Sequence, residues 1–169
     1  MDAATLLPAA VGTVVLTIAT TNAMQTSSKV RYGVLDDKGE KILVHPYSPW
    51  QAVPKGAEPA AARAYRACRA YENTKEWAQL SLPVMWLFQI YGSSVPYVEQ
   101  HHIDVATVGL SGLWFIAAQK YVAGYIKDAD DRSGGFKRRT QVFKVWAFGS
   151  MAAIACAALA RFAPGVLPK

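Results

Sequence analysis

The sequence predicts an all-α integral membrane protein built as a four-helix bundle. Three observations favour this fold class: four apolar stretches, charged residues that lie mostly between them, and 52% hydrophobic against 18% charged residues. A helix of about 20 apolar residues is about 30 Å long, which matches the hydrocarbon core of a bilayer. The chain of 169 residues is expected to form a single domain, residues 1–169, because no internal repeat or low-complexity segment divides it.

The four apolar stretches predict the spans in order. Residues 3–24 carry no charge; the alternative, a cleaved secretory signal, would begin with basic residues, whereas Asp2 is the charge found there. The second span is expected at residues 77–98, in a helix that begins near residue 60 and is kinked at Pro83. The third and fourth are expected at residues 103–125 and 142–162. A soluble bundle is the other alternative, but the first and last stretches lack the polar stripe that it requires.

Basic residues predict the orientation of these spans. The first connection, residues 27–60, and the third, residues 127–139, are rich in lysine and arginine, whereas the second, residues 92–104, has none. By the positive-inside rule the first and third connections face the cytoplasm and both termini lie on the opposite side of the endoplasmic reticulum or another organelle membrane. The net charge of +6 is then a topology signal, so nucleic acid is not an expected partner. Prolines and turn residues predict an ordered or partly ordered first loop.

Cysteine and histidine do not predict a metal site. Cys68 and Cys156 lie far apart without the spacing of metal ligands or of a disulfide framework. His101 and His102 lie beside acidic residues in the second connection. Adjacent histidines do not readily share one metal ion with good geometry, so a solvated loop is the favoured interpretation.

A polar stripe precedes the second span. At 100° per residue, Arg66, Arg69, Asn73 and Glu76 fall within about 80° of one another and share one helix face. Ionisable groups at membrane depth are costly and mark functional sites. The alternative is a cytoplasmic helical extension with solvated charges.

A second polar set ends the third span and continues into the loop. Tyr121 and Tyr125 are four residues apart and point the same way, and Arg132 follows seven residues later. The alternatives are an aromatic belt and an ordinary loop charge. Together the two sets predict a pocket for a small, multiply charged ligand, because guanidinium groups bind carboxylates as planar forks. Apolar helix surfaces beside this pocket could hold a lipid.

These residues resemble a known family. The segment from Arg69 to Glu76, followed by Trp86, and the segment from Gln119 to Tyr125 are similar to the membrane-associated proteins in eicosanoid and glutathione metabolism (MAPEG). This family includes leukotriene-C synthase, the microsomal glutathione transferases and the 5-lipoxygenase-activating protein. The resemblance implies a homotrimer that binds glutathione as cosubstrate between subunits near the cytoplasmic face, while a lipophilic electrophile enters from the bilayer.

The resemblance also implies residue roles. Arg132 would stabilise the glutathione thiolate, because a fixed cation lowers the pKa of a thiol that is otherwise mostly protonated. Arg31 would assist the opening epoxide oxygen. The glutathione-binding positions implied are Arg66, Arg69, Asn73, Glu76, Trp77, Tyr121 and Tyr125.

Two function classes follow. The first is a membrane glutathione transferase that acts on an epoxide, an activated halide or a lipid hydroperoxide, in lipid metabolism. The alternative is a non-catalytic lipid-binding helper or a structural subunit of a larger membrane complex. This chain has Tyr71, Trp77 and Gln79 where the synthase has Gln, Tyr and Pro, which favours the alternative. Arg132 favours the enzyme, because the activating protein lacks that arginine.

Overall fold

The computed structural model describes residues 3–33, 35, 38–41, 58–127 and 133–163. Four helices make up most of these residues: α1 (Ala3–Tyr32), α2 (Glu58–Tyr91), α3 (Gln100–Lys127) and α4 (Ser133–Phe162), with a 3₁₀ turn η1 (Gly92–Ser94) after α2. No β-strand occurs among the described residues, where Leu35 and Lys41 form a single antiparallel bridge. The predicted all-α architecture with four helices is confirmed.

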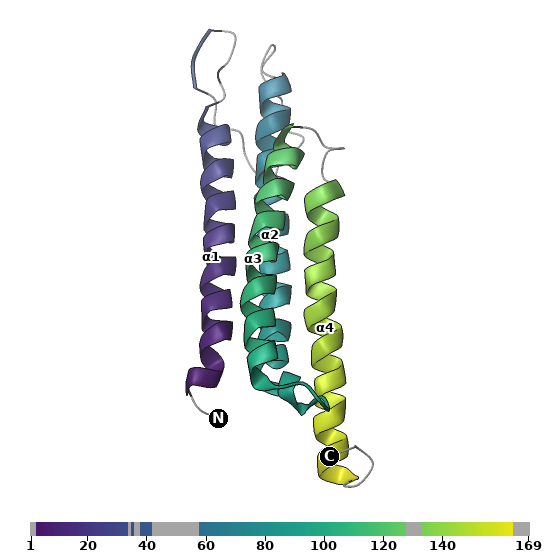
Figure 1. Cartoon of the computed structure of the whole chain (residues 1–169). Coiled ribbons are helices and arrows are strands. Elements are labelled where there is room, and N and C mark those ends of the chain that lie inside the picture. The colour runs from purple at the N-terminus through teal and green to yellow at the C-terminus, as the bar shows by residue number, and fades with distance from the viewer. Residues whose placement is uncertain (1–2, 34, 36–37, 42–57, 128–132, 164–169) are drawn as a thin grey trace.

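The helices run side by side, each antiparallel to the one before it (Figure 1). The central pair, α2 and α3, is flanked by α1 on one side and by α4 on the other. Within the described residues, the backbones of α1 and α4 each approach those of α2 and α3 closely but do not approach each other. Both outer helices therefore have a face that no other helix of this chain covers.

Several boundaries between helix and loop that the sequence predicted are wrong, because they lie where the hydropathy of the chain falls and not where the helix ends. The first helix continues to Tyr32, so Ser27 is not the start of a loop but lies buried in α1 and donates a hydrogen bond to the sulfur of Cys68 at 3.6 Å. At the other end α2 begins at Glu58, close to the predicted residue 60, and runs through Pro83. Charged residues favour helix as readily as apolar ones do, so a helix can outlast its apolar stretch.

The connections are shorter than predicted for the same reason. The second helix ends at Tyr91, not at residue 98, and the third begins at Gln100, so Asp104 belongs to a helix and not to the second connection. Lys137 and its two arginine neighbours, expected in the third connection, lie in α4. Most of the first connection falls outside the described residues.

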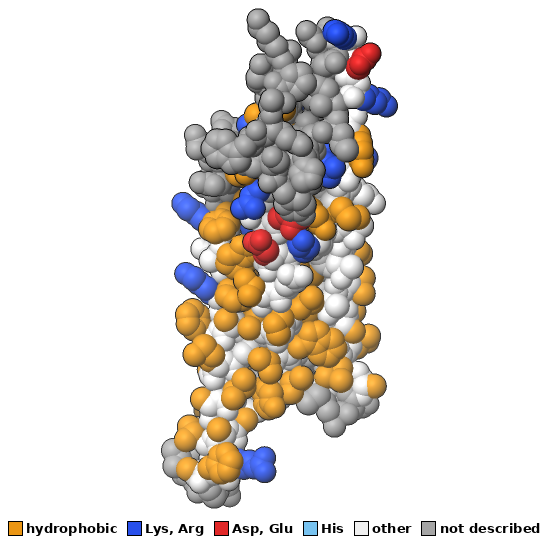
Figure 2. Space-filling model, turned by 180° about the vertical axis from the view of Figure 1, so that it is seen from behind, with side chains coloured by type: hydrophobic (Ala, Val, Ile, Leu, Met, Phe, Trp, Pro, Cys, Tyr) orange, Lys and Arg blue, Asp and Glu red, His pale blue; other side chains and the backbone are white. Residues whose placement is uncertain are grey.

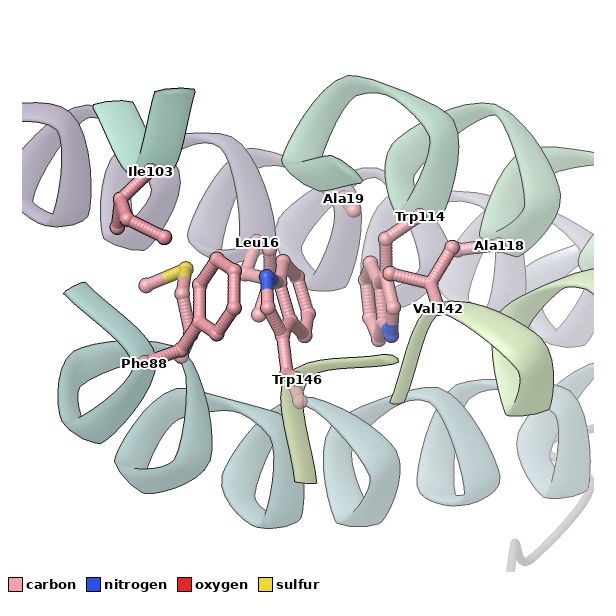
Figure 3. Packing of buried hydrophobic residues seen from close by; sticks show 10 residues of the cluster. Leu16, Ala19, Phe88, Ile103, Trp114, Ala118, Val142 and Trp146 are labelled. Carbon is pink, nitrogen blue, oxygen red and sulfur yellow. The ribbon is translucent and has the colours of Figure 1, made fainter. Parts of the chain in front are cut away.

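The main hydrophobic core is formed by side chains of all four helices. Trp114 of α3 and Trp146 of α4 are fully buried, and Leu16 of α1 and Phe88 of α2 pack around them (Figure 3). The first helix contributes mainly small residues at intervals of three or four, and a methyl group added at Gly12 would lie 2.6 Å from the sulfur of Met85. Small residues on this seam let the α1 backbone approach α2 and α3 closely.

Large hydrophobic side chains are exposed on the outer helix faces. On the face drawn in Figure 2, hydrophobic side chains spread over the lower part and most of the lysine and arginine side chains lie toward the upper end. The exposed hydrophobic residues of the described structure include Leu7, Val11, Val14 and Ile18 of α1, Val105, Val108, Leu113 and Ile116 of α3, and Val145, Phe148, Met151, Ile154 and Leu159 of α4. An apolar surface this extensive is rarely left in water.

By length and composition, two helices could cross a membrane: α1 (Ala3–Tyr32) and the segment Gly135–Phe162 of α4. The other two helices do not pass the same test within the described part of the chain. The first half of α2 carries the charged stretch from Arg63 to Glu76, and α3 begins with polar residues that include Asp104. These polar stretches lower the hydropathy of helices whose remaining residues are apolar.

Candidate functional site

The two polar motifs predicted from the sequence meet in the upper half of the bundle. Asn73 of α2 donates a hydrogen bond from its amide Nδ2 to the hydroxyl of Tyr121 on α3, at 2.7 Å. Tyr121 is buried and its ring stacks on that of Tyr125, with ring centroids 5.6 Å apart and an interplanar angle of 10°. Since the amide occupies one lone pair of the phenol oxygen, the phenol proton can still be donated to a ligand.

A close helix contact fixes the position of Tyr121. Gly135, in the first turn of α4, lies against the α3 backbone, where a Cβ atom would be 2.4 Å from the Tyr121 nitrogen and 2.6 Å from the Ala117 oxygen. Only glycine allows two backbones to approach so closely. The start of α4 is therefore held directly against the tyrosine of the polar cluster.

A buried arginine completes this cluster. Arg139 of α4 has no solvent exposure, and its Cζ atom lies 4.5 Å from the ring centre of Tyr121, 5.4 Å from that of Trp77 and 5.9 Å from that of Phe136. Its Nη1 atom donates to the hydroxyl of Thr74 at 3.4 Å. We refer to Asn73, Thr74, Trp77, Tyr121, Phe136 and Arg139 as the arginine cluster.

The predicted stripe on α2 is split between buried and exposed positions. Arg66 is partly buried and its Nε donates to the Ile126 carbonyl at the end of α3, at 3.3 Å. Arg69 and Glu76 are exposed, and neither bonds to the arginine cluster within the described residues. At 100° per residue Asn73 trails Arg66 by about 20°, whereas Arg69 and Glu76 trail it by about 60° and 80°. The first pair therefore faces α3 and the second pair turns toward the surroundings.

Trp77 lies inside the protein and contacts α4. Its ring makes edge-to-face contacts with Phe136 and Phe143, at centroid distances of 5.9 and 5.4 Å. These contacts, together with Arg139 over the ring, explain why the sequence tolerates a large apolar ring here.

The two residues predicted to be catalytic are not joined to this cluster. Arg132 lies outside the described residues. Arg31, near the end of α1, has its guanidinium carbon 5.6 Å from the ring centre of Tyr32, and its buried Nε has no hydrogen-bond partner. The last turn of α1, which carries Arg31, lies toward the end of the bundle at which α4 begins (Figure 1).

A groove of about 270 Å³ runs between α1 and α2, beside the polar residues of α2. Thr17 and Thr20 in its wall donate their hydroxyl protons to carbonyls of their own helix, at 2.8 and 2.9 Å, so neither of these protons is available to a ligand. Lys75, which forms an ion pair with Glu72, lies at the polar end of the groove. The groove is lined by Leu16, Thr17, Thr20, Thr21, Met24, Tyr71, Lys75, Ala78, Gln79 and Leu82.

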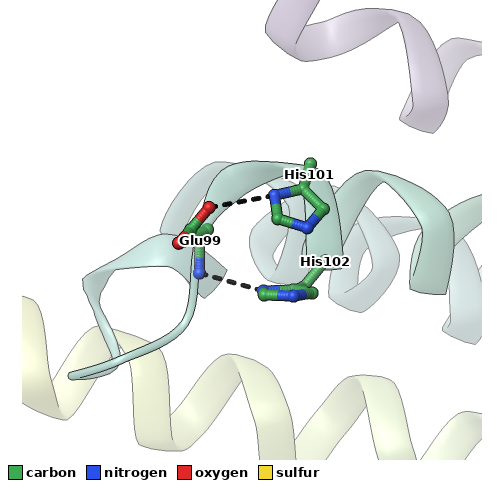
Figure 4. Close-up of polar contacts among 3 residues, drawn as sticks. All are labelled: Glu99, His101 and His102. Carbon is green, nitrogen blue, oxygen red and sulfur yellow. Dashed lines mark hydrogen bonds and ion pairs between the residues drawn. The ribbon is translucent and has the colours of Figure 1, made fainter.

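Polar residues at the opposite end of the bundle have structural roles. Gln89 is fully buried and donates to the Thr5 carbonyl at 2.7 Å and to the Asp104 carboxylate at 2.5 Å, which ties α2 to α1 and α3. His101 pairs with Glu99 at 3.2 Å, and the Glu99 backbone nitrogen donates to His102 at 3.3 Å (Figure 4). Both histidines belong to the first turn of α3 rather than to a loop.

In the part of the chain that the structure describes, no group of three or more histidine, cysteine, aspartate and glutamate side chains could hold a metal ion.

The sequence interpretation missed Arg139, which it treated as one of several loop charges. A signal was present: Arg139, Val142, Trp146 and Ser150 are three or four residues apart, so the arginine continues the buried face of α4. Extending the apolar face of the fourth stretch toward its N-terminus would have placed this arginine in the protein interior.

Neither models of known protein families nor curated proteins match this sequence. The motif resemblance to the membrane-associated proteins in eicosanoid and glutathione metabolism therefore rests on the residues quoted for it, and its functional content is a proposal.

Proposed function

We propose that this protein is a membrane-bound glutathione transferase. In this proposal all four helices cross the endoplasmic reticulum or another organelle membrane, the first and third connections face the cytoplasm, and three copies assemble as a homotrimer. Glutathione is the thiol cosubstrate and the acceptor is a lipophilic electrophile. The two apolar outer helices and the concentration of basic residues at one end of the bundle support membrane insertion in this orientation.

The observation that carries the proposal is the hydrogen bond between Asn73 and Tyr121. It joins two motifs that lie 48 residues apart in the chain and that were singled out separately as glutathione-binding positions. An amide and a phenol held together in a partly buried site are suited to the peptide groups of glutathione, which offer both donors and acceptors. Arg66 and Tyr125 lie on the same two helices beside this pair.

The reaction in this proposal is nucleophilic attack by sulfur. The thiol of glutathione loses its proton to water, and Arg132 stabilises the resulting thiolate. The sulfur then forms a bond to carbon while a carbon–halogen bond breaks and releases the halide ion, or while an epoxide carbon–oxygen bond breaks and leaves an alkoxide. With an epoxide, Arg31 stabilises the developing alkoxide before it takes up a proton. The groove between α1 and α2 supports a lipophilic acceptor, because its walls are mainly apolar and it opens beside the polar residues of α2.

The test is conjugation of glutathione to 1-chloro-2,4-dinitrobenzene by the purified protein in detergent. Tyr121→Phe removes the hydroxyl that Asn73 contacts, and we expect kcat/KM to fall roughly tenfold, the typical loss for one hydrogen bond to a charged or polar ligand. Tyr91→Phe is the matched control, because Tyr91 ends α2 at the opposite end of the bundle. Arg132→Ala should lower kcat more strongly than KM, and unchanged turnover would remove this residue from the mechanism.

The groove also favours the second function class, a non-catalytic lipid-binding helper or a structural subunit of a larger complex. Glutathione binding separates the two classes. A ligand that binds the folded state alone raises stability by about 2.7 kcal/mol at a hundredfold excess over its dissociation constant. No conjugation and no rise in melting temperature with glutathione would favour the helper.

A further inference from the structure

The buried guanidinium of Arg139 lacks the partners that such a group normally has. Its Nε and Nη2 atoms are buried without a hydrogen-bond partner, and its remaining bond, to the Thr74 hydroxyl, is long at 3.4 Å. No carboxylate forms an ion pair with it within the described residues. Buried charges in proteins are usually paired and fully hydrogen-bonded, because an uncompensated charge away from water is costly.

The surroundings of Arg139 explain how the protein tolerates this charge. The rings of Tyr121, Trp77 and Phe136 all lie within 6 Å of the guanidinium carbon, which is the range of cation–π contact. Arginine suits such a site because its planar guanidinium stacks on rings and is weakly hydrated. The rings contact the cation but accept no conventional hydrogen bond, so the donors Nε and Nη2 stay unused.

Arg139 lies in the second turn of α4, close to the positive end of the helix dipole. The first turn of α4 has no acidic side chain, and Lys137, Arg138 and Arg139 follow in the next turn. A helix N-terminus carries about half a positive charge, which favours an anion and not a further cation. No side chain in these two turns of α4 therefore offsets the charge of Arg139; Asp128, Asp130 and Asp131 precede the helix in the sequence, outside the described residues.

We infer that Arg139 is the centre of an anion-binding site between α2, α3 and α4, and that its ligand is a carboxylate of glutathione. The identity of the ligand rests on the proposed function, whereas the anion site itself rests on the unpartnered guanidinium. A carboxylate would accept hydrogen bonds from Nε and Nη2 in the fork geometry that arginine offers, and the Tyr121 hydroxyl could donate a further one. Phe136, whose ring centre is 5.9 Å from the guanidinium carbon, is 41% exposed, so the cluster reaches the surface of the described structure on this side.

The test measures ligand-induced changes in melting temperature, each relative to the same variant without ligand. Arg139→Gln removes the charge and the fork, and Arg138→Gln is the matched control, because Arg138 is exposed and adjacent. We expect glutathione to bind Arg139→Gln roughly tenfold more weakly or worse, as for a lost charge-assisted hydrogen bond, and Arg138→Gln within about twofold of wild type. An analogue with a methyl group in place of the thiol keeps both carboxylates, so its affinity should fall in Arg139→Gln as well. Equal affinity of this analogue for Arg139→Gln and wild type would show that a carboxylate is not the ligand of Arg139.

A second arm separates failure of this inference from failure of the proposed function. Sodium acetate replaces sodium chloride at equal ionic strength, and acetate should raise the melting temperature of wild type and Arg138→Gln but not of Arg139→Gln. That result upholds the anion site even where glutathione does not bind. Equal responses of the two glutamine variants in both arms would overturn the inference. If Arg139→Gln does not fold, Arg139→Lys takes its place, because it keeps the charge and loses the fork, and wild-type affinity in that variant would also overturn it.

Discussion

The contact between Gly135 and α3 sets how closely the arginine cluster is assembled, and Gly135→Ala tests it. The added Cβ would lie 2.4 Å from the Tyr121 nitrogen, 2.6 Å from the Ala117 oxygen and 2.7 Å from the Tyr121 Cα. Ordinary contacts of a carbon atom are about 3.5 Å, so the start of α4 must move about 1 Å away from α3. All three atoms belong to the α3 backbone, which cannot rotate aside as a side chain can.

The magnitude follows from two opposing effects. Inserting one carbon atom into a closely packed contact costs about 1–3 kcal/mol. Replacing glycine by alanine within a helix contributes up to about 1 kcal/mol in the opposite direction, and less in a first turn such as that of Gly135. We expect the free energy of unfolding to fall by about 1–2 kcal/mol, which corresponds to a decrease in melting temperature of several degrees.

The matched control is Gly109→Ala in α3, where an added Cβ meets no atom within 4 Å. This variant gains the helix propensity without the contact, so its melting temperature should stay the same or rise. Thermal unfolding in one detergent, followed by circular dichroism, compares the two variants with wild type, and glutathione affinity should fall only in Gly135→Ala because Tyr121 is displaced. A Gly135→Ala protein that melts at or above the wild-type temperature would refute the close α3–α4 contact.

Three further predictions concern the buried Gln89, the hydrophobic core and the membrane topology. Gln89→Met leaves the Thr5 carbonyl and the Asp104 carboxylate short of a donor and should lower stability by about 1–3 kcal/mol in thermal unfolding; a loss below about 0.5 kcal/mol would contradict this role. Trp146→Ala removes a fully buried ring from the core and should lower the free energy of unfolding by about 3–5 kcal/mol. Phe148→Ala on the exposed face should change it by less than about 0.5 kcal/mol, and equal losses in the two variants would show that the core lies elsewhere. Single cysteines introduced at Lys38 and Tyr97, in a protein without the native cysteines, should react with a membrane-impermeant maleimide from opposite sides of sealed vesicles. Labelling of both cysteines from the same side would exclude the proposed topology.

The division of the α2 stripe shows what helical periodicity could and could not predict. Periodicity placed Arg66, Arg69, Asn73 and Glu76 on one face of α2, where the four positions span about 80° around the helix axis. Which edge of that face meets α3 depends on the rotation of α2 against its neighbours. Packing of Ala67 and Ala70 sets this rotation, so Asn73 bonds to Tyr121 while Glu76 is exposed.

The sequence by itself determined that the chain forms four helices, because unbroken apolar stretches and segregated charges leave few other ways to bury the chain. It also determined that basic residues gather at one end of the bundle. That α1 and α4 are the outer helices was decided by the tertiary structure. Only the tertiary structure decided the extent of each helix, since a helix continues wherever neighbouring helices support it. It also decided that Arg139, in a run of three basic residues, is the buried one, because burial depends on which face of α4 meets Trp77 and Tyr121.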